Sequence, residues 1–86
     1  MKALILSYFD PIVGPKILLK VPESIENKDL EIIPSLMDVY EEKFFVHITE
    51  TIKCANFIFE IPNPYSRGKM ELFQISIVSG INSKLN

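Results

Sequence analysis

Apolar residues fall into five short runs, at positions 2–9, 16–21, 44–49, 54–61 and 70–79. The breaks between several of these runs are rich in proline or glycine, at positions 11–15, 22–27 and 62–68. Short apolar runs bounded by turn-forming residues are typical of β-strands. The pattern therefore predicts five strands, with a hairpin between the first two.

One stretch follows a helical period instead. Ile33, Leu36, Met37 and Tyr40 recur at the spacing of one helix face, which predicts a helix within positions 29–42. Pro34 conflicts with a long uninterrupted helix because proline lacks a backbone N–H group. We expect the helix to begin near Pro34 or to be kinked there.

The strand runs are apolar at both odd and even positions. Phe57, Ile58 and Phe59 are consecutive, for example, whereas a sheet with one wet face should alternate apolar and polar residues. Both faces of the sheet should therefore need cover, and one helix shields only one face. The second cover is either a helical layer begun by residues 81–86, or another protein. We expect a homodimer or a heterologous partner.

Composition limits the class of protein. The chain has 86 residues, 48% of them hydrophobic and 23% charged, which predicts a single globular domain over residues 1–86. The net charge of −2 argues against a nucleic-acid partner. No apolar run approaches the roughly 20 residues that span a bilayer, so we expect no direct membrane insertion. We expect a cytoplasmic protein that reaches membrane surfaces only through partners.

The residues do not form a self-contained catalytic set. The serines lack the sequence context of an activated nucleophile, Cys54 has no base placed by a motif, and His47 has no neighbours at metal-ligand spacing. Cys54 is the only cysteine and cannot form an internal disulfide. We therefore expect no enzyme activity by the domain itself, no cofactor and no metal.

The segment at positions 62–69 is the most specific loop. Pro62 and Pro64 restrict the backbone and Gly68 permits a turn, so the loop should hold Arg67 outward. A rigid loop that presents a guanidinium group suits contact with another protein. The candidate partner-binding residues are Tyr65, Ser66, Arg67 and Lys69.

Two blocks of sequence resemble a known family. Positions 9–17 read Phe-Asp-Pro-Ile-Val-Gly-Pro-Lys-Ile and positions 21–23 read Val-Pro-Glu. This opening is similar to that of the longin domain in the nitrogen permease regulator 2 family. The similarity resumes at positions 65–67, Tyr-Ser-Arg, which are again followed by an apolar strand. Between the blocks only the order of expected elements is similar.

The resemblance implies an α+β, longin-like (profilin-like) fold, a β-β-α-β-β-β antiparallel sheet. The form would be minimal, because most of the family's C-terminal helices would be missing. It also implies regulation of a small Rag-like or Ras-like GTPase, with Arg67 as an arginine finger in trans. The partners would be the GTPase and either a second copy or another longin-type or roadblock-type protein. The alternative is a non-catalytic adaptor or scaffold for complex assembly or vesicle trafficking.

Overall fold

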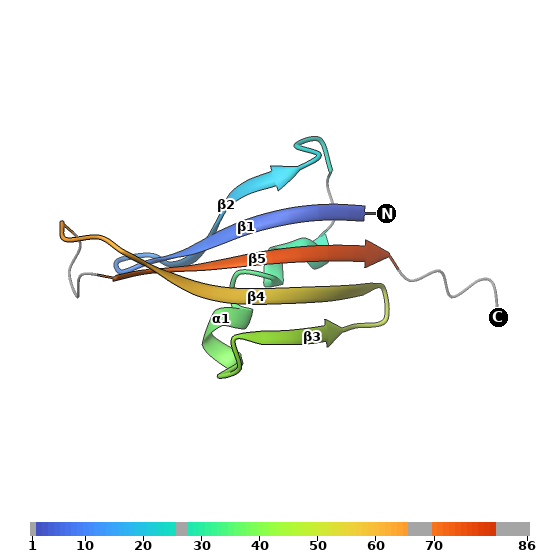
Figure 1. Ribbon diagram of the computed structural model, residues 1–86. Coiled ribbons are helices and arrows are strands. Elements are labelled where there is room, and N and C mark those ends of the chain that lie inside the picture. The colour runs from blue at the N-terminus through green and yellow to red at the C-terminus, as the bar shows by residue number, and fades with distance from the viewer. Residues whose placement is uncertain (1, 26–27, 66–69, 81–86) are drawn as a thin grey trace.

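The computed structural model describes residues 2–25, 28–65 and 70–80. They form one five-stranded sheet in which every pair of neighbouring strands is antiparallel, in the order β2-β1-β5-β4-β3. The strand bounds are β1 (Lys2–Asp10), β2 (Gly14–Val21), β3 (Phe44–Ile48), β4 (Ile52–Pro62) and β5 (Met70–Gly80). Strand β5 lies in the middle of the sheet, and β2 and β3 are its edges (Figure 1).

Local hydrogen bonds and one glycine shape the turn between β1 and β2. One carboxylate oxygen of Asp10 accepts the backbone N–H groups of Ile12 and Val13, at 2.8 and 3.0 Å. Gly14 then has φ +97°, a conformation that residues with a Cβ rarely adopt. In Figure 1 this turn lies at the same end of the sheet as the end of β4 and the start of β5.

The helical content is much smaller than the sequence pattern predicts. A 3-10 helix, η1 (Lys28–Ile32), and a four-residue helix, α1 (Leu36–Val39), replace the expected longer helix. Around Pro34 the backbone hydrogen bonds join residues that are three positions apart. The N–H group of Ser35, for example, donates to the carbonyl of Ile32 at 3.1 Å. The periodic spacing of apolar residues survives because such turns still place Ile33 and Leu36 on the side that faces the sheet.

The fold-class prediction of an α+β longin-like domain is wrong. The five expected strands are present, but the described chain has almost no helix, only η1 and the single turn of α1. The physical reason lies at Pro34, which removes an N–H donor where a long helix needs one. Residues 81–86, considered above as the start of a second helical layer, lie outside the described residues.

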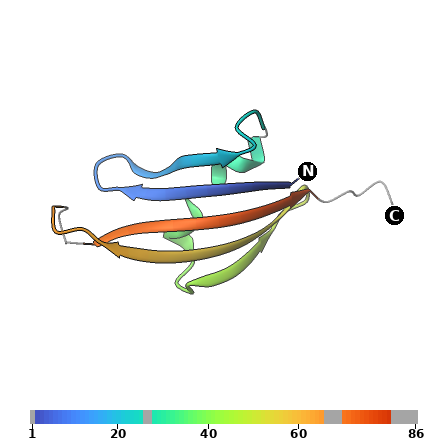
Figure 2. The ribbon, with the colours of Figure 1, turned by 45° about the horizontal axis from the view of Figure 1, so that its top comes forward.

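Both short helices lie on the same side of the sheet (Figures 1 and 2). Leu30, Ile33 and Leu36 pack there against apolar side chains of the strands. The strand residues of this buried cluster are Ala3, Ile5, Phe45, Ile52, Cys54 and Val78. We call this side of the sheet the covered face.

The centre of the covered face is polar. Gln74 Nε2 donates to the carbonyl of Ile33 at 3.0 Å, which ties the helical segment to β5. Ser76 Oγ donates to Asn56 Oδ1 at 2.6 Å, and Gln74, Ser76 and Asn56 are all nearly or fully buried. Ser7 Oγ is also buried and has no hydrogen-bond partner among the described residues. Hydrogen bonds make most of this polar burial tolerable.

Candidate functional site

The opposite side of the sheet is apolar across all five strands and has no layer over it in the described structure. On β5, Phe73, Ile75 and Ile77 point to this side, in alternation with the buried Gln74 and Ser76. Strand pairing extends the surface in both directions from β5. We call it the uncovered face; its apolar residues are Leu4, Leu6, Tyr8, Leu19, Val21, Phe44, Val46, Ile48, Ala55, Phe57, Phe59, Ile61, Phe73, Ile75 and Ile77.

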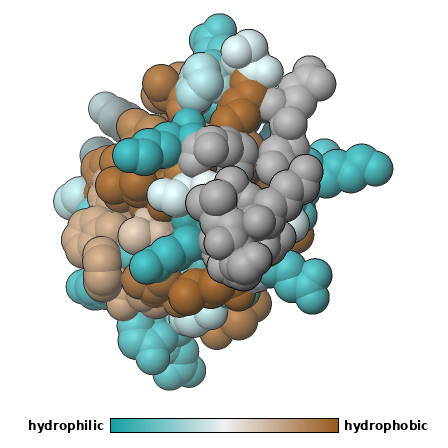
Figure 3. All heavy atoms as spheres, turned by 90° about the vertical axis from the view of Figure 1, so that its right-hand side faces the viewer, coloured by the Kyte–Doolittle hydropathy of each residue, from teal (hydrophilic) through white to brown (hydrophobic). Residues whose placement is uncertain are grey.

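Many of these side chains are well exposed for their type. Ile77 is 61% exposed although it lies on the central strand, and Phe44 on the edge strand is 64% exposed. Figure 3 shows hydrophobic side chains at the surface of the molecule, between hydrophilic side chains that project outward. Scattered exposed apolar residues are ordinary, whereas a contiguous apolar surface marks an interaction site.

Stacked aromatic rings lie near the centre of the uncovered face. Phe59 stacks on Phe73 across the β4–β5 pair, with ring centroids 5.7 Å apart, and on Phe57 along β4 at 5.9 Å. Tyr8 lies opposite Phe73 on the other side of β5, and Phe44 lies opposite Phe57. Aromatic side chains bury a large area at a low cost in side-chain entropy, which suits them to protein interfaces.

Among the described residues, charged side chains lie only at the perimeter of the uncovered face. Lys2 and Lys53 both pair with Ser79 near one end of β5, and Glu71 lies near the other end of the same strand. Lys16 lies on the edge strand β2, opposite Tyr8. An apolar centre with a charged rim is the usual anatomy of a protein–protein interface.

The predicted partner-binding loop falls largely outside the described residues. Ser66, Arg67 and Lys69 are not described. Tyr65 is 95% exposed, and its N–H group donates to Asn63 Oδ1 at 3.0 Å. Asn63 also donates through Nδ2 to Glu71 at 3.0 Å, so the start of the loop is tied to β5. The sequence alone points to these loop residues as the site and to no individual residue of the uncovered face. The signal for the face is the presence of apolar residues at both odd and even positions of the strands.

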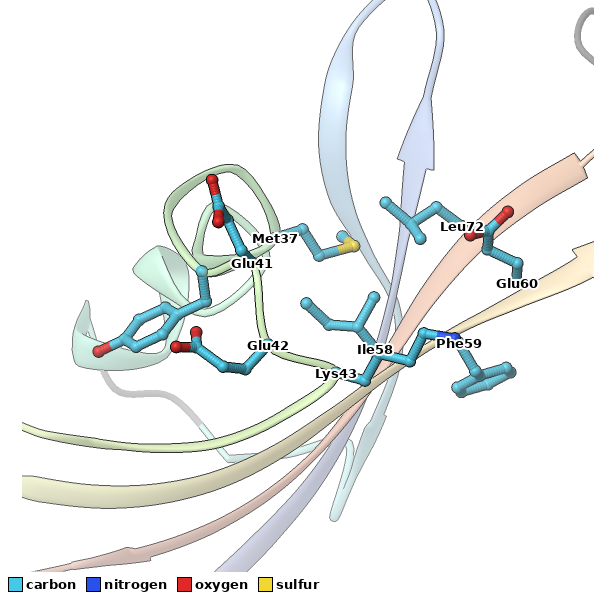
Figure 4. Close-up of a pocket in the computed structure, with 9 residues that line it drawn as sticks. Met37, Glu41, Glu42, Lys43, Ile58, Phe59, Glu60 and Leu72 are labelled. Carbon is cyan, nitrogen blue, oxygen red and sulfur yellow. The ribbon is translucent and has the colours of Figure 1, made fainter.

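A surface pocket of about 210 Å³ lies at the end of α1. Met37, Ile58 and Leu72 point toward one another at its base (Figure 4). Glu41, Glu42 and Glu60 lie around it and are exposed. Exposed carboxylates of this kind are solvated charges, and no buried polar group is aimed into the pocket among its lining residues.

The remaining reactive residue types have structural surroundings. Cys54 is fully buried, and burial raises the pKa of its thiol, which disfavours the nucleophilic thiolate. His47 Nδ1 lies 2.9 Å from the hydroxyl of Tyr40, on the covered side of edge strand β3. Within residues 2–25, 28–65 and 70–80, no group of three or more His, Cys, Asp or Glu side chains is placed to hold a metal ion.

Among the described residues there is no helix with the length and apolar character required to cross a lipid bilayer.

Comparison with models of known protein families and with curated proteins finds no match. The resemblance to the nitrogen permease regulator 2 family therefore stays a hypothesis that depends on the residues quoted for it.

Proposed function

We propose that this domain is a non-catalytic protein-interaction module, an adaptor or scaffold whose uncovered face is covered by another protein surface. The observation that carries the proposal is the composition of β5, the central strand. Phe73, Ile75 and Ile77 are directed to the uncovered face, while the middle of its covered side holds the polar residues Gln74 and Ser76, between Leu72 and Val78. Removal of such apolar surface from water is the main driving force for protein association.

Site-specific photo-crosslinking tests the proposal in intact cells. A photoreactive amino acid replaces Ile77 on the uncovered face or, as a matched control, Val39 on α1, which is 71% exposed. We expect one protein adduct of defined mass from position 77, identified by mass spectrometry, and none from position 39. The adduct should disappear when Phe57 is also replaced by Asp.

Two results would contradict the proposal. One is the absence of any protein adduct from position 77 under conditions in which the reagent reacts with solvent. The other is an equal yield of the same adducts from positions 77 and 39, which would indicate random collision.

The expected cytoplasmic location stays a prediction.

Regulation of a small GTPase stays a separate hypothesis, supported by the sequence resemblance alone. It places the function at Arg67, outside the described residues, and not on the uncovered face. If Arg67 is an arginine finger, Arg67→Ala lowers stimulated GTP hydrolysis by about 10³- to 10⁵-fold while the complex with the GTPase persists. Single-turnover hydrolysis by Rag-type GTPases measures this, and unchanged stimulation would contradict the finger role.

A further inference from the structure

We infer that the occupant of the uncovered face is a second copy of this chain, packed face to face about a twofold axis that crosses β5 at Ile75. The inference deepens the proposed function and rests on it. Three features of the described residues support a second copy: the size of the face, the absence of charge from its centre, and the arrangement of charge at its two ends.

The face is large enough for a specific dimer. The β1–β5 ladder contains seven residue pairs, and the sheet has five strands. With a rise of about 3.4 Å per residue and about 4.8 Å between strands, the flat area is roughly 24 Å by 24 Å, or ~580 Å². Two such faces bury more than about 1,000 Å² in total, the usual lower bound for a specific interface.

The centre of the face tolerates contact with itself. A twofold axis brings each residue near the axis close to the same residue of the second copy. A charge there would meet a like charge, which destabilises an interface. Ile75 and its cross-strand neighbours Leu6 and Phe57 are all uncharged, so the surface around the proposed axis is self-complementary.

The ends of the face select the orientation of the second copy. Along β5, Glu71 and Ser79 are each four residues from Ile75, and Lys2 and Lys53 flank Ser79. A twofold axis that lies in the plane of the interface, at right angles to the strands, places the lysine end of one copy over Glu71 of the other. An axis along the strands would instead place Lys2 of one copy over Lys53 of the other, so that like charges meet.

The usual packing angle between two sheets is compatible with the axis at right angles to the strands. Two twisted sheets that pack face to face align their strands within about 30°. That angle displaces Glu71 of the second copy from Ser79 toward a neighbouring strand, and the neighbours of Ser79 carry Lys2 and Lys53. Opposite charges then meet at both ends of the interface.

Sedimentation velocity on the purified chain tests the inference. We expect a mass of twice the 9.9 kDa chain for the wild type. Ile75→Lys should raise the dimer dissociation constant by about 100-fold or more, because two buried like charges then face each other across the axis. Ile77→Lys is a second disrupting variant at a 61% exposed site, and Val39→Lys on α1 should leave the dimer intact. Circular dichroism confirms that each variant is folded.

A charge exchange tests the orientation. Glu71→Lys should weaken the dimer by roughly tenfold or less, because rim ion pairs contribute little individually. Combination with Lys2→Glu and Lys53→Glu should restore the wild-type dissociation constant. Failure of this rescue, with Ile75→Lys still disruptive, overturns the proposed axis.

Two further results overturn the second copy as the occupant. A wild-type chain that stays monomeric at high micromolar concentration is one, and a dimer that Ile75→Lys and Ile77→Lys leave unchanged is the other. In either case the cellular crosslink from position 77 decides separately whether the proposed function survives. A heterologous adduct keeps the interaction module and removes the homodimer, whereas no adduct removes both.

Discussion

The centres of the two faces of this sheet have compositions opposite to those expected from their surroundings. The covered face, under η1 and α1, has Gln74, Ser76 and Asn56 at its centre. The uncovered face has aromatic and aliphatic side chains at its centre, such as Phe57 and Ile75. The helical segment therefore covers the side of the sheet with the polar centre, and the side with the apolar centre lacks cover among the described residues.

The difference agrees with the proposal that one face holds the fold together and the other binds a partner. On the covered face, the bond from Gln74 to the carbonyl of Ile33 fixes one position for a helical segment that is too short to be stable alone. Polar contacts are directional, so they specify that position better than apolar contacts do. On the uncovered face, a broad apolar surface can drive association, and stacked aromatic rings keep its shape.

Truncation of one isoleucine on each face should produce the largest contrast. Ile5 is fully buried on the covered face, so Ile5→Ala should lower the free energy of unfolding by about 2–5 kcal/mol. Ile77→Ala on the uncovered face should cost less than about 1 kcal/mol at a concentration where the chain is monomeric. Urea titration at low protein concentration measures both values. Equal losses would mean that the uncovered face is already packed within the monomer.

The buried polar centre should respond to truncation in a position-dependent way. Gln74→Ala removes the donor to the carbonyl of Ile33 and should lower stability by about 1–3 kcal/mol. Ser7→Ala removes a buried hydroxyl that has no partner among the described residues, so it should be neutral or stabilising by up to about 1 kcal/mol. Urea titration compares the two variants. A loss in Ser7→Ala as large as that in Gln74→Ala would show that Ser7 makes a hydrogen bond.

A smaller effect should follow from removal of one hydroxyl group on each face. Tyr40 stacks on Phe45 with centroids 3.9 Å apart, and its hydroxyl lies 2.9 Å from His47 Nδ1. Tyr40→Phe should keep the stack and lose about 1 kcal/mol of stability. Tyr8→Phe on the uncovered face is the matched control and should change stability by less than about 0.5 kcal/mol. The shift in the thermal midpoint measures the difference, and equal shifts would argue against a stabilising Tyr40–His47 bond.

The sequence pattern predicted the strands well because turn-forming residues limit the apolar runs. Gly14 and the Asp10 carboxylate, for example, form the turn between β1 and β2 where that break was expected. The surplus of apolar residues at both parities also predicted a face without cover. Its covering by a partner was a prediction from the same surplus and stays one.

The short helices and the polar centre of the covered face could not be predicted from the sequence pattern. A spacing of three or four residues fits both an α-helix and a chain of tighter turns, so Ile33 and Leu36 did not reveal the effect of Pro34 on the backbone. Alternation in β5 correctly separates Gln74 and Ser76 from Ile75, but it suggests that the polar side faces water. Only the tertiary contact between Gln74 and Ile33 reverses that interpretation. Arg67 lies outside the described residues, so its role as an arginine finger stays a prediction.

The smallest effect is expected outside both faces, at the β1–β2 turn. The bonds that Asp10 accepts from the N–H groups of Ile12 and Val13 lower the pKa of its carboxyl group, because they stabilise the charged form. The resulting stabilisation is present at neutral pH and is lost as the pH falls through the lowered pKa of the folded state. Asp10→Ala should therefore cause a small loss of thermal stability at pH 7 that vanishes in acid.

Asp10→Asn separates the two parts of this effect. Its side-chain oxygen can still accept the two N–H groups, but it has no charge to titrate. The asparagine variant should therefore keep part of the stability at pH 7 and show no dependence on pH from this position. Thermal midpoints measured from neutral pH down to acid pH test this, with the mass of the protein in solution checked at each pH. Equal dissociation of the proposed dimer in acid for Asp10→Ala and the wild type would indicate that the turn acts on folding alone.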